Sequence, residues 1–126
     1  MRTQRMLCLA LAAALMAAGA FLAVLPQGLV AADLGTGIGD KPAHGVIGAI
    51  VTSLLLYGQG GFQPLRAACV LLLIAGLSGA LEIVQPLAGR AGELSDWLAG
   101  DLGALLAIGA ACLAGFSRSA RPTAGP

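Results

Sequence analysis

A small set of polar side chains interrupts an otherwise apolar chain, and these side chains could bind a polar ligand or transfer protons. Lys41 and Arg90 are cations that suit a phosphate group, and His44 can act as a base or a hydrogen-bond donor. Carboxylates and an amide could orient such a ligand through hydrogen bonds to its hydroxyl groups. The candidate ligand-binding residues are Asp40, Lys41, His44, Glu82, Gln85, Arg90, Asp96 and Asp101.

The spacing of these residues predicts that several of them share helix faces. Asp40 and His44 are four residues apart, and Glu82 and Gln85 are three apart, so each pair lies on one face of a helix. Placing an ionisable group in a membrane helix costs free energy unless the group is paired or faces a polar cavity. We therefore expect either an outward polar pocket or a purely structural cluster that pins helix ends together.

The composition indicates that lipid surrounds the elements that carry these residues. Hydrophobic residues make up 58% of the 126 residues and charged residues 10%, and the mean hydropathy is +0.90. Apolar runs rich in Ala and Leu without two-residue alternation predict helices rather than strands. The predicted fold is an all-α membrane protein, a bundle of four transmembrane helices at about residues 6–25, 43–57, 65–85 and 96–116.

The predicted boundaries divide the chain into a short N-terminal end at 1–5, a membrane domain at 6–116 and a tail at 117–126. Ser95 is the predicted N-cap of the last helix. The first apolar run has a second interpretation, because Arg2 and Arg5 could form the basic start of a cleaved signal peptide.

The basic residues predict the orientation of the four helices. With four spans, Lys41 and Arg90 lie on one side, and the side with more arginines is expected to be cytoplasmic. Both termini are then cytoplasmic, and the polar site faces outward. The arginines on the cytoplasmic side are Arg2, Arg5, Arg66, Arg118 and Arg121.

Composition and spacing also limit the partners. The net charge of +1 gives no basic stripe, so no nucleic-acid partner is expected, and neither a cofactor nor a metal site is predicted. The cysteines, Cys8, Cys69 and Cys112, are interpreted as small apolar helix residues. Small residues recur every four positions and predict a face for a second copy or another membrane protein. That face comprises Ala99, Gly103, Ala107, Ala111 and Gly115.

Four short motifs, in order, resemble the VanZ-like family of membrane proteins: "DKPAH", "E-x-x-Q", Arg90 and "D-x-x-x-G-x-x-G-A". The resemblance covers roughly residues 39–110. It implies a multi-pass protein of the bacterial cytoplasmic membrane with a role in the cell envelope, in a family named for a protein associated with teicoplanin resistance. The positions that it implies are Asp40, Lys41, His44, Glu82, Gln85, Arg90, Asp96 and Gly103.

The chain departs from the family pattern at one position of the last motif. The family usually has Asn four residues after the Asp, whereas this chain has Gly100 there and Asp101 one residue later. Each residue adds about 100° of rotation around a helix. The Asp101 side chain therefore takes the position of the family's Asn side chain only if the helix shifts locally.

Two functions are compatible with the polar residues, beside the structural cluster. The first is binding of a membrane lipid head group or a lipid-linked envelope glycan or glycopeptide. The second is an enzyme acting on a phosphorylated lipid or glycolipid, with His44 as base and Glu82 or Asp96 orienting it. The sequence offers no convincing nucleophile, and this favours binding over catalysis.

Overall fold

The computed structural model describes residues 2–25, 40–89 and 92–119, and within these ranges the chain is helical without any strand. Helix α1 spans Arg2–Val24, α3 spans Asp40–Gly58 and α4 spans Pro64–Val84. A short 3-10 helix, η1, continues α4 over Gln85–Ala88, and α5 spans Leu94–Ser119. The prediction of an all-α protein is confirmed for this part of the chain.

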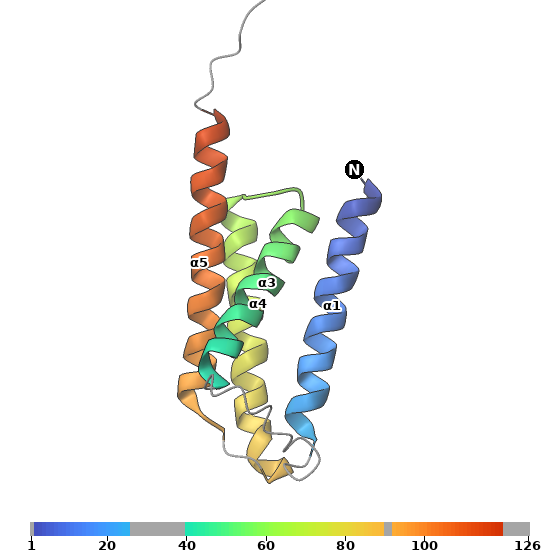
Figure 1. Cartoon of the computed structure of the whole chain (residues 1–126), viewed down its shortest axis with the longest axis vertical. Helices are drawn as coiled ribbons and strands as arrows, with labels where there is room; N and C mark the ends of the chain where they lie inside the picture. The colour runs from blue at the N-terminus through green and yellow to red at the C-terminus, as the bar shows by residue number, and fades with distance from the viewer. Residues whose placement is uncertain (1, 26–39, 90–91, 120–126) are drawn as a thin grey trace, which may run out of the picture.

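The helices run up and down beside one another (Figure 1). The start of α1, the end of α3, the start of α4 and the end of α5 lie at one end of the bundle. The end of α1, the start of α3, η1 and the start of α5 lie at the opposite end, which is called the polar end below. Residues that are far apart in the sequence are thereby gathered at the polar end.

Among the described residues, three helices are long and apolar enough to cross a membrane: Arg2–Val24, Pro64–Ala88 and Leu94–Gly115. Large apolar side chains point outward from these helices, with Leu65, Ile83 and Leu87 between 77% and 86% exposed. Such exposure over whole helices is unfavourable in water and costs little in lipid. The chain therefore has the helices of a membrane protein.

Helices α3 and α5 approach each other most closely, and glycines make this possible. A Cβ atom added at Gly48 would overlap the backbone of Gly100, and one added at Gly103 would overlap the carbonyl group of Gly45. In lipid, helices associate through packing of this kind because burial of apolar surface gives no advantage over contact with lipid tails. Gly103 of the predicted partner face thus packs against α3 within the chain.

A small core holds the four helices together. Thr52 of α3 and Val70 of α4 are fully buried in it. Near the other end of α3, Gly58 allows α1 to approach, since a Cβ there would lie 2.6 Å from Cγ of Leu9. The buried apolar residues are Ala12, Val51, Leu55, Leu56, Ala67, Val70, Ile74 and Ala104.

The structure corrects several predicted details at the helix ends. Ser95 is not the N-cap of α5, because the helix begins at Leu94 and the carbonyl oxygen of Glu93 accepts the first N–H groups, from Asp96 and Trp97. The third predicted helix, at about 65–85, changes after Val84 to the 3-10 helix η1, which continues to Ala88. The second begins at residue 40 rather than 43, which places "DKPAH" in its first turns.

Candidate functional site

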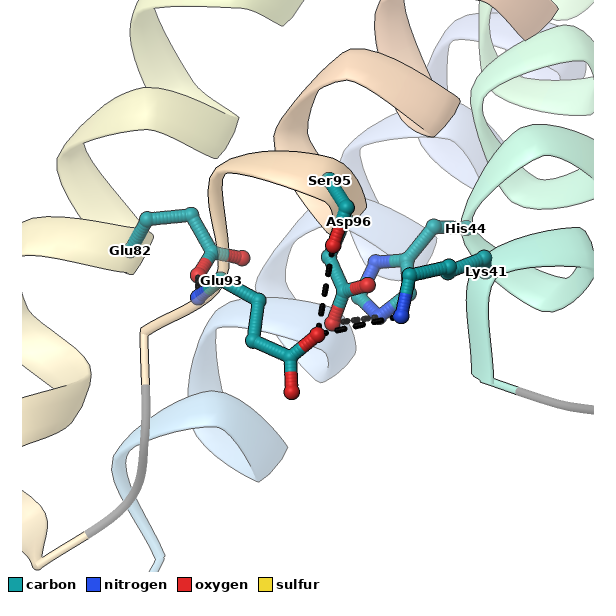
Figure 2. Close-up of polar contacts among 6 residues, drawn as sticks. All are labelled: Lys41, His44, Glu82, Glu93, Ser95 and Asp96. Atoms are coloured by element: carbon teal, nitrogen blue, oxygen red, sulfur yellow. Dashed lines mark hydrogen bonds and ion pairs between the residues drawn. The ribbon is translucent and has the colours of Figure 1, made fainter.

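An interaction network joins three helices at the polar end, with Glu93 at its centre (Figure 2). Lys41 Nζ from α3 lies 3.1 Å from Glu93 Oε2, and the Ser95 hydroxyl donates to the same oxygen over 3.2 Å. The backbone N–H of Glu93 donates to Glu82 Oε2 on α4 over 2.7 Å. The loop before α5 is therefore tied to both α3 and α4.

His44 and Asp96 form a second pair beside this network. His44 Nε2 lies 3.7 Å from Asp96 Oδ2, and the Asp96 side chain is 12% exposed. The other oxygen, Asp96 Oδ1, is buried and has no hydrogen-bond partner among the described residues. Leaving a buried carboxylate oxygen unpaired is costly. The site therefore has an acceptor that a bound donor could satisfy.

A cavity of about 170 Å³ lies next to this pair and is lined by all four helices. Its walls are mainly apolar, with Leu15 and Met16 from α1, Val51 from α3 and Ile74 from α4. The polar residues in its lining are His44, Ser78, Glu82, Gln85 and Asp96. The cavity thus combines apolar walls with a polar rim.

The break between α4 and η1 presents Gln85 to the cavity. The Gln85 backbone N–H still bonds to the Leu81 carbonyl oxygen, and Pro86 follows as a residue that cannot donate. Gln85 is 8% exposed and lines the cavity. Its amide offers both donors and an acceptor.

Four predicted site residues, His44, Glu82, Gln85 and Asp96, line the cavity together. The pairing of Lys41 with Glu93 occurs outside that lining. Arg90 and the side chain of Asp40 lie outside the described residues.

The two positions that depart from the family pattern have different surroundings. Gly100 lines the cavity, where the family usually has Asn, whereas Asp101 is not among the lining residues. Asp101 Oδ1 is buried and lacks a hydrogen-bond partner within the described ranges. The absence of a side chain at Gly100 leaves space in the cavity, and Asp101 does not fill that space.

Sequence reasoning missed two parts of the site. One is the α1 wall, which includes Gly19, Ala20 and Ala23; their close spacing of small residues was the available signal. The other is Glu93, which contacts more of the polar network than any predicted residue. The residues around Glu93, at positions 92–97, gave no indication that its side chain would face Lys41.

The Lys41–Glu93 contact predicts a pH-dependent contribution to stability. The hydrogen bond from Lys41, then that from Ser95 and the Lys41 charge, hold the pKa of Glu93 below its ordinary value of 4.5. A carboxylate with a lowered folded-state pKa stabilises the fold above its unfolded pKa, and this contribution is lost as pH falls through the folded value. Glu93→Gln should lower the melting temperature slightly at pH 7, because the contact is exposed.

The same difference should shrink in acid and vanish once the pH is below the lowered pKa of folded Glu93, where the wild-type carboxyl is protonated. Ser53→Ala serves as a control, because its hydroxyl donates to the Ala49 carbonyl oxygen within its own helix. A melting-temperature difference between wild type and Glu93→Gln that persists unchanged in acid would contradict the assignment.

Comparison of the chain with protein-family models, with curated proteins and with solved structures gives no match. The resemblance to VanZ-like proteins therefore rests on the short motifs, and the geometry of the cavity carries the functional argument.

Proposed function

We propose that the protein is a VanZ-like, multi-pass protein of the bacterial cytoplasmic membrane whose cavity binds an amphiphile from the outer face. The ligand is a lipid head group or a lipid-linked envelope glycan or glycopeptide, and the role is an accessory one in the cell envelope, related to glycopeptide (teicoplanin) resistance. One observation carries the proposal: a single cavity has apolar walls from four helices and a polar rim at the polar end. That combination matches a molecule with an apolar tail and a polar head.

The proposal includes four spans with both termini cytoplasmic. Helix α3 has 19 residues, which at about 1.5 Å per residue extend about 28 Å, close to the hydrocarbon core of about 30 Å. It is not among the helices that are apolar enough by themselves to cross a membrane, but it contacts α1, α4 and α5. Its exposed side chains include the apolar Val46, Ile47 and Ile50, which suit contact with lipid tails.

The rim supports a head group with hydroxyl or amine donors. The buried Asp96 Oδ1 has no partner among the described residues, and Glu82 and Gln85 add further acceptors beside it. A sugar hydroxyl or an ammonium group would satisfy these oxygens, and a charge-assisted bond to a carboxylate is among the stronger hydrogen bonds. Lys41, beside the rim, suits a phosphate that links head to tail, and Arg90, which lies outside the described residues, has a side chain of the same suitable type.

A second candidate function is a membrane enzyme acting on a phosphorylated lipid or glycolipid. The His44–Asp96 pair favours it, because a carboxylate 3.7 Å from an imidazole can orient that ring as a general base. The cavity lining supplies Ser78 as its only hydroxyl, and Ser78 donates to the Ile74 carbonyl oxygen. Water would then be the nucleophile, and the reaction a hydrolysis.

Mass spectrometry of lipids that co-purify with the protein in detergent tests the proposal. Wild type should retain one lipid class well above its share of the bulk lipid, and Asp96→Asn should reduce that retention about tenfold. Glu93→Gln is the matched control, since it makes the same carboxylate-to-amide change at the polar end outside the cavity lining.

Both variants need a single folded peak in size-exclusion chromatography before they are compared. Equal retention by wild type and folded Asp96→Asn would contradict a ligand at this rim. If Asp96→Asn lowers the melting temperature and wild type retains no enriched lipid, the polar cluster is structural. If wild type slowly releases a hydrolysed head group from the retained lipid and His44→Ala does not, the protein is an enzyme.

A further inference from the structure

Charge is segregated along the bundle. All six acidic residues lie at positions 33, 40, 82, 93, 96 and 101, so residues 2–25, 41–81 and 102–126 contain none. The end of the bundle opposite the polar end instead carries Arg2 and Arg5 at the start of α1 and Arg66 at the start of α4. This arginine end has no carboxylate on the same helix turns to neutralise it.

Two of these arginines converge on the turn between α3 and α4. A Cβ added at Gly60 would lie 3.3 Å from Arg5 Nη1 and 3.7 Å from Arg66 Nη1. The two Nη1 atoms are therefore no further apart than the sum of those distances, a span that two oxygens of one phosphate group can bridge. Arg5 and Arg66 are distant in sequence, so the fold itself brings like charges together.

The backbone of the turn is built to allow this approach. Gly60 and Gly61 have φ values of 101° and 102°, which other residues rarely adopt. At Gly58 an added Cβ would lie 3.2 Å from the Arg5 carbonyl oxygen, so α1 passes directly beside the end of α3. Arg5 is held at the turn by this packing.

The guanidinium groups of Arg5 and Arg66 carry more N–H donors than the described residues use. Arg66 Nη1 donates to the Gln59 carbonyl oxygen, and a guanidinium group carries five N–H donors in all. Among the described residues, neither Arg5 nor Arg66 forms an ion pair. Two adjacent cations without a carboxylate repel each other, and an anion between them removes that repulsion.

We propose that Arg5 and Arg66 bind the phosphate group of an anionic phospholipid at the arginine end. The location favours a lipid over a soluble anion, because Arg5 and Arg66 lie within the first turns of the spans Arg2–Val24 and Pro64–Ala88. Lipid phosphates lie at that depth. Tyr57, 55% exposed at the end of α3, is an aromatic residue of the kind enriched at the membrane interface. This site is separate from the cavity.

Native mass spectrometry of the full chain with phosphatidylglycerol or phosphatidylcholine at equal concentration tests the proposal. Wild type should retain phosphatidylglycerol about tenfold better than phosphatidylcholine, and Arg5→Gln should abolish that preference. Arg2→Gln is the matched control, because it removes the same charge from the same helix end without touching Gly60. Arg66→Gln should repeat the loss, although it also removes the bond to Gln59.

Arg5 makes no hydrogen bond to a described residue through its side chain, so Arg5→Gln should fold as wild type does. Equal preference in wild type and Arg5→Gln, or an equal loss in Arg2→Gln, would overturn the proposal. A third arm adds inorganic phosphate at the concentration of the lipid. If phosphate alone raises the melting temperature as much as phosphatidylglycerol, the site takes a soluble anion, and the assignment to a lipid is overturned.

Discussion

Gly103→Ala should strongly destabilise the protein, with a fall in melting temperature on the order of 10 °C. The added methyl group would overlap the Gly45 carbonyl group and approach the backbone nitrogen of Ala49 to 3.1 Å. Both are backbone atoms, so no side chain can rotate away and α3 must shift as a whole. A thermal melt of the detergent-solubilised protein measures the effect.

Gly109→Ala is the matched control on the same helix, because nothing lies within 4 Å of a Cβ at that position. It should match wild type or exceed it slightly, since alanine favours a helix over glycine. The shift of α3 in Gly103→Ala should also separate His44 from Asp96 and reduce ligand retention. Equal melting temperatures for the two alanine variants would show that α3 and α5 do not cross as closely as the structure has them.

Gly19→Leu should reduce retention of the proposed amphiphile by at least about tenfold, while the protein stays folded. Gly19 lines the cavity on its α1 wall, and a Cβ there meets nothing within 4 Å. A leucine side chain occupies much of a cavity of about 170 Å³, and it removes no hydrogen bond or charge. Lipid mass spectrometry on the purified variant gives the retention.

Gly76→Leu provides the matched comparison for Gly19→Leu. Gly76 also has open space around its Cβ position, but it lies on α4 outside the cavity lining. It should retain the ligand as wild type does. If folded Gly19→Leu also retains the ligand fully, the ligand does not occupy the cavity. Loss of the ligand in Asp96→Asn would then place it at the rim, and full retention in both variants would place it elsewhere on the protein.

The helices of the described chain could be predicted because composition alone dictates them. Long runs of Ala and Leu in lipid must satisfy their backbone groups internally, so the four helical segments followed from the sequence to within a few residues. The ends were less predictable. Ser95 is a favourable capping residue by type, yet the backbone of Glu93 starts the helix and Ser95 donates to its side chain instead.

The candidate site was predictable where residues share a helix and unpredictable where helices meet. His44, Glu82 and Asp96 lie on three different helices, and each is near the outer end of its predicted helix, so the sequence indicated that they share one end of the bundle. The cavity between them could not be predicted, because its α1 wall depends on how α1 packs. Gly100 shows the same limit, since only the crossing of α3 and α5 determines which α5 residue faces the cavity.

Helix α1 forms one wall of the cavity but is the least firmly held part of the bundle. It packs mainly on α3 and meets α4 at few residues, although both α1 and α4 line the cavity. Lipid tails can replace those few apolar contacts at little cost. The seam between α1 and α4 is therefore where we expect the proposed ligand to enter, sideways from the outer half of the bilayer. Its arrival rate then depends on its abundance and diffusion within the membrane plane, not on its solubility in water.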